Sequence, residues 1–212
     1  MIFQKEMLKL YAITDRGCLT PNYPTIYDQV KAALEGGVTI VQLREKNLSY
    51  DEFLAEAISI RELCHSYNVP LIINDNLDIA IESKADGVHV GIEDTPVSEI
   101  RKKAGKDFII GATSKTLEQA RIAYESGANY MGVGAVFPSP TKKNAIRITN
   151  QQLNSIVNSV PIPAVAIGGI TYDNIKEIKC ENLSGYALVS AIFGANDITK
   201  AAKDLLERID TI

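Results

Sequence analysis

The sequence predicts a (β/α)8 barrel of the TIM type, and three observations carry that prediction. Short apolar runs rich in β-branched residues alternate with segments whose apolar residues recur at helical spacing, and eight such pairs fit along the chain. The runs are apolar nearly throughout, as parallel strands covered on both faces are. No Gly/Ser-rich linker or change of composition interrupts the 212 residues, so we expect one compact domain over residues 1–212 rather than an open doubly wound sheet.

The expected elements follow in order along the chain. The eight strands are expected near residues 8–14, 38–43, 70–73, 86–90, 107–111, 129–134, 163–167 and 185–189. Helical spacing is clearest over residues 27–34, 50–64, 117–126 and 198–209, and it is less regular over 77–83 and 172–178. Ser49, Thr116 and Thr171 precede acidic residues at the start of such segments, which is typical of a helix N-terminus.

Composition excludes several classes of function. A net charge of -4 and the lack of a dense basic stripe argue against nucleic acid as a partner. Three scattered cysteines without a CxxC pair indicate a reducing compartment and no zinc site. No apolar run reaches membrane-spanning length and no signal peptide is evident, so we expect a cytoplasmic protein without a membrane partner, and a homo-oligomer stays open.

The end of the second predicted strand carries long polar side chains, and chemistry in such a barrel lies at the carboxyl ends of the strands. Gln42, Arg44 and Lys46 alternate along the chain and therefore share one side of the strand. Polar groups of that length, directed into an otherwise apolar barrel end, suit an anionic ligand. A salt bridge at the rim, for instance of Arg44 with Glu45 or a neighbouring acid, is the alternative.

Two carboxylates follow the third and fourth predicted strands. Asp75 comes directly after Asn74 at the end of one apolar run, and Asp94 follows the next run along the chain. Carboxylates with room for water and phosphate oxygens suit Mg²⁺, which seldom has an all-protein cage. Asp94 could instead cap the next helix. We expect His89, in the fourth strand, to be a hydrogen-bonded packing residue rather than a catalyst.

Small and hydroxyl-bearing residues follow the remaining strands. Thr113 closes the fifth strand, and the loop after the sixth, over residues 132–143, presents Ser139, Thr141 and Lys142 between prolines. Hydroxyls beside a lysine on a stiff loop suit phosphate oxygens, although a surface turn with solvated lysines is the alternative.

A second anion site is expected where the seventh and eighth strands end. Gly168 and Gly169 follow one of these strands, and Ser190 follows the other. Backbone N–H groups hold a phosphate at this place in many such barrels, although the glycines could also form only a tight turn. Cations with a metal at the first site and neutral donors at the second suit a pyrophosphate leaving group and a single phosphate. No Ser-His-Asp set, activated cysteine or histidine cluster for a metal is evident.

Seven motifs, in the same order over nearly the whole chain, resemble the thiamine phosphate synthase family. They are YAITD at 11–15, VQLREK at 41–46, IND at 73–75, GVHVG at 87–91, FPSPTK at 137–142, AIGGI at 166–170 and VSAI at 189–192. The resemblance implies a (β/α)8 barrel that joins hydroxymethylpyrimidine pyrophosphate to thiazole phosphate. The products are thiamine phosphate and pyrophosphate, and the mechanism is dissociative.

The resemblance also assigns roles to residues of this chain. Arg44, Lys46 and Lys142 would hold the pyrophosphate, with Thr113 beside them in the reaction. Asp75 and Asp94 would bind Mg²⁺. The pyrimidine or its pyrophosphate would contact Gln42, Asn74, Thr113, Ser139 and Thr141, and the thiazole phosphate would contact Gly169, Val189 and Ser190.

The chain departs from the family pattern at a few positions, and two other functions compete. Thr113 and Ser139 exchange one hydroxyl residue for another, Ala135 replaces a usual proline, Ile92 stands where glutamine is common, and the segment after Lys143 lacks a usual glycine. A thiazole tautomerase of the same barrel family would need an acid/base group near the ring and has no use for the cationic set. A non-catalytic protein that binds thiamine precursors is the other alternative.

Overall fold

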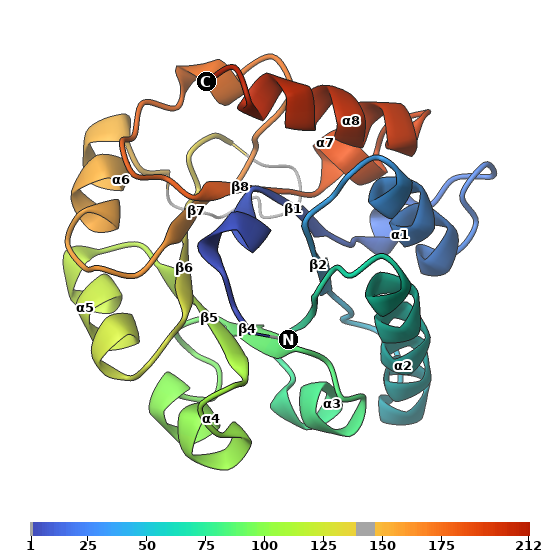
Figure 1. Ribbon diagram of the computed structural model, residues 1–212, viewed down its shortest axis with the longest axis horizontal. Helices are drawn as coiled ribbons and strands as arrows, with labels where there is room; N and C mark the ends of the chain where they lie inside the picture. Colours follow the sequence, from blue (N-terminus) through green and yellow to red (C-terminus); the bar gives the residue numbers. More distant parts are fainter. Residues whose placement is uncertain (1, 139–146) are drawn as a thin grey trace.

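In the computed structural model, which describes residues 2–138 and 147–212, parallel strands close into a barrel (Figure 1). Each strand pairs with the next along the chain, and the last pairs with the first. The closed barrel predicted from the alternating pattern is confirmed. The strands are β1 (Leu10–Ile13), β2 (Ile40–Leu43), β3 (Leu71–Asn74), β4 (Gly87–Val90), β5 (Ile109–Ser114), β6 (Tyr130–Gly134), β7 (Ala164–Ile167) and β8 (Gly185–Leu188).

Helices form a ring outside the strands (Figure 1). Ser49 and Thr116 cap α2 and α5 by accepting hydrogen bonds from backbone N–H groups, as predicted. The α-helices are α1 (Ile26–Glu35), α2 (Tyr50–Ser66), α3 (Leu77–Glu82), α4 (Val97–Ala104), α5 (Leu117–Glu125), α6 (Asn150–Val157), α7 (Ser190–Phe193) and α8 (Ile198–Ile209). Short 3-10 helices are η1 (Lys5–Leu8), η2 (Arg16–Cys18) and η3 (Ile175–Glu177).

The structure differs from the expected elements in two places. The fifth strand was expected near residues 107–111 with Thr113 and Ser114 at its end, and β5 includes both of these residues but begins only at Ile109. The expected helix over 172–178 is only the 3-10 turn η3. There Asn174 accepts a hydrogen bond from the N–H of Thr171 and donates one to the carbonyl of Gly169, and these local bonds compete with helical ones.

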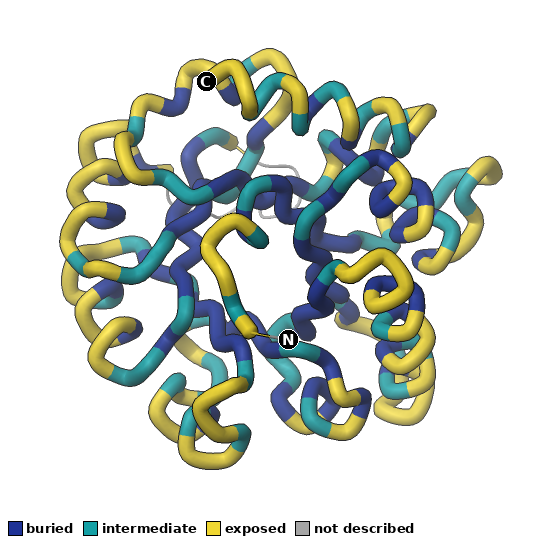
Figure 2. Tube along the Cα trace, in the orientation of Figure 1, coloured by how far each residue is buried: buried dark blue, intermediate teal, exposed yellow. Residues whose placement is uncertain are grey.

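The apolar core has two layers, one inside the barrel and one between the strands and the helices. The inner layer includes Leu8, Ile40, Ile72 and Val165, and the outer layer is formed by the opposite faces of the same strands and the helices around them. Figure 2 shows this as a buried inner ring with helices exposed on their outer faces. In the described parts of the chain, no helix has the length and apolar character needed to cross a lipid bilayer.

The N-terminal segment closes the end of the barrel at which the strands begin. Leu8 of η1 is fully buried in the inner layer, and the ring of Phe3 stacks on that of Tyr130 with 6.0 Å between centroids. Figure 1 shows η1 lying across this opening. Because this end is filled, a ligand can reach the polar groups inside the barrel only from the end at which the strands finish.

Candidate active site

A lysine and two aspartates meet where β2, β3 and β4 end. The ammonium of Lys46 donates a hydrogen bond to the Asp75 carboxylate over 2.6 Å. The Asp75 and Asp94 carboxyls lie within hydrogen-bonding reach of each other, and Asp94 also accepts a hydrogen bond of 2.7 Å from the Gly91 N–H. Asp94 does not cap α4, because the residue before that helix is Pro96, so the expectation of a helix-capping Asp94 is wrong.

The electrostatics of this group fit a cation. Burial favours a raised pKa for Asp75, but hydrogen bonds from Lys46 and Asp94 outweigh it and lower the pKa. Burial raises the pKa of Asp94, and the neighbouring Asp75 charge adds to the effect. Two adjoining carboxylates therefore lie at one place on the rim, with the Lys46 ammonium bonded to Asp75, and the all-oxygen donor set suits Mg²⁺. No group of three or more acids, histidines or cysteines capable of holding a metal occurs in residues 2–138 and 147–212, so other ligands must complete such a site.

A cleft of about 710 Å³ opens beside this ionic group. Lys46, Asn74 and Asp75 line it together with Glu45 and Thr95. Asn74 and Asp75 reach the cleft because the β3 strand ends there, and Asp75 takes a left-handed backbone conformation with φ of 61°. The sequence-predicted metal and pyrophosphate residues Lys46, Asn74 and Asp75 are therefore brought together by the fold.

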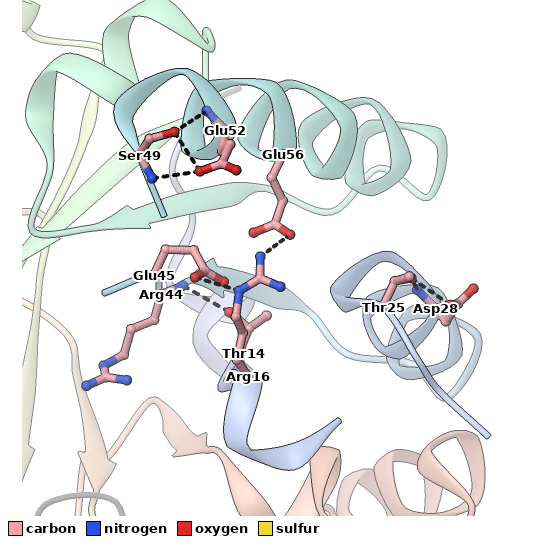
Figure 3. Close-up of polar contacts among 9 residues, drawn as sticks. All are labelled: Thr14, Arg16, Thr25, Asp28, Arg44, Glu45, Ser49, Glu52 and Glu56. Carbon is pink, nitrogen blue, oxygen red and sulfur yellow. Dashed lines mark hydrogen bonds and ion pairs between the residues drawn. The ribbon is translucent and has the colours of Figure 1, made fainter. Parts of the chain in front are cut away.

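Arg44 is held by its backbone and points away from the neighbouring acids. Its N–H donates a hydrogen bond of 2.9 Å to the hydroxyl of the buried Thr14, at the end of β1. In Figure 3 its guanidinium is directed away from Glu45. Among the described residues no ion pair joins Arg44 to an acid, so the Arg44–Glu45 example is wrong, whereas Lys46 does form a rim salt bridge, with Asp75.

Glu45 pairs instead with Arg16, which follows β1 (Figure 3). The Arg16 guanidinium donates to Glu45 over 2.8 Å and to Glu56 of α2 over 2.6 Å. The Glu45 side chain is only 2% exposed, and burial raises the pKa of Glu56. Sequence reasoning missed Arg16 and Glu56. The available signal was strand alternation, which sends Glu45 to the side opposite Arg44.

A chain of hydrogen bonds crosses the inside of the barrel between two predicted substrate-binding residues. Gln42 of β2 donates to the hydroxyl of Tyr11 over 2.8 Å, and the Tyr11 and Tyr130 hydroxyls are 2.7 Å apart. Tyr130 lies 3.1 Å from Nδ1 of His89, whose Nε2 lies 3.1 Å from the hydroxyl of Thr113. The expectation that His89 is a hydrogen-bonded packing residue is confirmed. The tyrosines were missed because they occur in apolar runs like any strand residue.

The ends of β7 and β8 lie side by side, since Ile167 pairs with Ala187. Gly168 and Gly169 have positive φ of 101° and 64°, which glycine adopts without strain. Val189 is partly buried and Ser190 is exposed beyond β8. The residues expected to form the second anion site are therefore neighbours in the fold.

The loop after β6 is anchored to this second site. The N–H of Phe137 donates to the carbonyl of Gly168, and a side chain at Gly169 would lie 2.2 Å from the carbonyl oxygen of Pro138. Gly169 is therefore needed for close packing against residues 137–138, whatever else it binds. The predicted residues Ser139, Thr141 and Lys142 lie outside the described residues.

Comparison with known proteins decides the family. The sequence pattern of the thiamine monophosphate synthase family matches residues 10–192, and the thiamine-phosphate synthase of Clostridium tetani is 43% identical over 92% of this chain and 93% of that protein. The chain belongs to the thiamine monophosphate synthase family. The thiamine-phosphate synthase of Clostridioides difficile is 45% identical over 92% of each chain. The solved thiamine phosphate pyrophosphorylase of Pyrococcus furiosus superimposes with a TM-score of 0.89 at 38% identity, covering 98% of both chains.

Two of the departures expected from the thiamine monophosphate synthase pattern, at Thr113 and Ala135, fit their surroundings, and the third, at Ile92, has no structural explanation. Thr113 keeps a hydroxyl, and it lies within hydrogen-bonding distance of His89. Ala135 is buried where a side chain on Gly168 would come within 2.6 Å of its Cβ, so the two chain segments are closely packed. Ile92 is 57% exposed, and no contact of its side chain explains it.

Proposed function

We propose that the chain is a thiamine-phosphate synthase, which joins hydroxymethylpyrimidine pyrophosphate to thiazole phosphate. The products are thiamine phosphate and pyrophosphate, so the enzyme is a transferase of thiamine biosynthesis. Family membership supports the reaction, and one arrangement carries it: Lys46, Asp75 and Asp94 meet on the rim next to the end of β2 that carries Arg44. The substrates are small molecules, and we place the reaction in the cytoplasm, where free cysteines stay reduced.

The reaction requires a charged leaving group to depart before the new bond forms. The bond between the pyrimidine methylene carbon and the pyrophosphate oxygen breaks, and its electron pair leaves with pyrophosphate. The thiazole nitrogen then donates its own lone pair to the pyrimidine cation, so no general base is needed at that step. Arg44 and Lys46 would stabilise the charge that develops on the leaving oxygen.

Asp75 and Asp94 would hold a Mg²⁺ ion. When bound there, the ion supplies further positive charge to the pyrophosphate oxygens. Lys46 would release its hydrogen bond to Asp75 in favour of the pyrophosphate, because both acceptors lie at the same rim. Asn74, at the end of β3, would contact the pyrimidine substrate.

The second anion site would take the thiazole phosphate. Gly169, Val189 and Ser190 lie at the adjoining ends of β7 and β8, where backbone N–H groups bind phosphate in many barrels. The pyrophosphate contacts expected of Ser139, Thr141 and Lys142 fall outside the described residues. The two substrates would therefore meet between the ends of β2 and β7, above the interior of the barrel.

The deciding experiment is a coupling assay with both substrates. Purified protein is incubated with hydroxymethylpyrimidine pyrophosphate, thiazole phosphate and Mg²⁺, and thiamine phosphate and pyrophosphate are quantified together. Equal amounts of the two products are expected. Omission of thiazole phosphate is the control, and it should remove thiamine phosphate. Binding of both substrates without any turnover would contradict the proposal and support a non-catalytic binding protein.

A further inference from the structure

The five residues inside the barrel form an unbroken hydrogen-bonded row. It runs from Gln42 through Tyr11, Tyr130 and His89 to Thr113, with heavy-atom distances of 2.8, 2.7, 3.1 and 3.1 Å. Tyr11 and Tyr130 are at most 1% exposed, and Gln42 is 3% exposed. Gln42 and Thr113 are the two ends, and both were predicted to contact the pyrimidine substrate. The proposed reaction mechanism gives Tyr11 and Tyr130 no role.

The direction of every hydrogen bond in the row follows from its first member. The amide nitrogen of Gln42 can only donate, so Tyr11 must send its own hydrogen to the oxygen of Tyr130. Tyr130 then has one hydrogen left, and the remaining neighbour is Nδ1 of His89. Burial raises the pKa of both phenols well above the ordinary value, so both keep their hydrogens.

The opposite direction leaves a hydrogen without an acceptor. If Nδ1 of His89 carried a proton, Tyr130 would accept it and donate to Tyr11. The hydrogen of Tyr11 would then face the amide nitrogen of Gln42, which has no lone pair to accept it. A doubly protonated imidazole fails for the same reason.

Two glycines leave the space that this hydrogen-bonded row occupies. A Cβ atom on Gly111 would lie 2.2 Å from the Tyr130 ring and 2.4 Å from Nδ1 of His89. A Cβ atom on Gly132 would lie 3.1 Å from the His89 ring. Two neighbouring strands, β5 and β6, thus carry glycine where the phenol and the imidazole lie.

We propose that Tyr11 and Tyr130 are positioning residues which hold His89 as the neutral imidazole with its hydrogen on Nε2. In that form Nε2–H donates to the oxygen of Thr113 and leaves the hydroxyl hydrogen of Thr113 for a substrate atom. Thr113 thus presents a hydrogen-bond donor, and Gln42, whose amide nitrogen faces Tyr11, presents its carbonyl oxygen as an acceptor. The effect on turnover rests on the proposed function, whereas the protonation state of His89 does not.

The first test reads the imidazole directly and needs no substrate. The chain has only two histidines, so protein labelled with ¹⁵N-histidine gives two sets of ring signals at neutral pH. His65, which pairs with Asp86 at the surface, serves as the internal reference. We expect His89 to show a protonated Nε2 and an accepting Nδ1. Tyr130→Phe keeps the ring but removes the donor to Nδ1, and it should shift the Nδ1 signal while leaving His65 unchanged.

A proton on Nδ1 of His89 in the unmodified protein would overturn the proposal. So would a Tyr130→Phe variant whose Nδ1 signal is the same as before. Both results would be informative even if the coupling assay failed, because neither depends on turnover.

The second test asks whether the tyrosines act through Thr113. Tyr130→Phe should lower kcat/KM for the pyrimidine substrate about tenfold, the usual effect of losing one neutral hydrogen bond. In a Thr113→Val background, which has no hydroxyl to position, the same change should have almost no further effect. Thr113→Ser should keep the sensitivity to Tyr130→Phe. Losses that multiply in the double variant would mean that Tyr130 acts only on stability, and would overturn the positioning role.

Discussion

Lys46 and Asp75 join the ends of β2 and β3 through a hydrogen bond of 2.6 Å between ammonium and carboxylate. About half of the Lys46 side chain and a third of that of Asp75 are exposed, so the pair is open to exchange with a bound ligand. An exposed pair of this kind contributes at most about 1 kcal/mol to folding. Its position on the rim therefore has more to do with binding than with stability.

Asp75→Asn should reduce turnover by about 10² or more, because it removes a contact to the Mg²⁺ ion that would offset the charge of the departing pyrophosphate. The loss should come with a weaker response to Mg²⁺ in steady-state kinetics. Asp78→Asn is a matched control, since Asp78 is an exposed carboxylate on the same cleft that pairs with Lys103. Full activity of the unmodified protein after exhaustive chelation would exclude the metal role of Asp75.

Ser190→Ala should raise KM for thiazole phosphate roughly tenfold and leave KM for the pyrimidine substrate unchanged, because one hydrogen bond to a charged phosphate is lost. Ser126→Ala, at the end of α5 on the far side of the barrel, is the control. Ser190 is a cleaner choice than Gly169, where any side chain would first collide with Pro138. An effect confined to the pyrimidine substrate would reverse the assignment of the two anion sites.

Glu56→Gln should change how stability depends on pH. Burial raises the pKa of Glu56, so the native state keeps this proton at a pH at which the unfolded chain has released it. Raising the pH from about 4.3, the ordinary glutamate value, therefore lowers the free energy of unfolding of the unmodified protein. The variant lacks that loss, so its stability relative to the unmodified protein should grow as pH rises through this window. Urea denaturation of both proteins at successive pH values measures this difference in free energy of unfolding. A difference that does not change with pH would contradict the prediction.

Gly111→Ala should destabilise the fold by about 1–3 kcal/mol, because the new Cβ enters the space of the Tyr130 ring. Gly17→Ala is the control, since its nearest neighbour is the Asp15 side chain at 3.3 Å, and a change within about 0.5 kcal/mol is expected. Thermal and urea unfolding give both values. Equal free energies of unfolding for the two variants would mean that the Tyr130 ring and the side chains around it can move to make room for the added Cβ atom.

The fold could be predicted from the sequence because apolar strand segments and helical segments alternate regularly along the chain. All eight strands lie in or beside the apolar runs, since strands buried on both faces must be apolar. The apolar run that predicts β5 stops before Thr113 and Ser114 because both are polar, yet β5 includes them and Thr113 faces a histidine inside the barrel. The helix expected before β8 failed because the side chain of Asn174 bonds to its own neighbours.

The site was predictable in its rim charges but not in its interior. Lys46, Asp75 and Asp94 were predictable because strand ends of a barrel share one edge. The Arg16–Glu45 pair was not, because its partners lie 29 residues apart in the sequence and no local pattern links them. The Tyr11–Tyr130 contact joins β1 to β6, and no local pattern records such a distant partner.

The pairing of Leu10 with Tyr186 sets an order of events during synthesis. β1 leaves the ribosome early, and its partner β8 follows only after most of the chain has been made. At about 5–20 residues per second, the interval is on the order of ten seconds or more. For that time the edge of β1 that β8 will cover has no partner, and its four apolar residues are a site where nascent chains could associate.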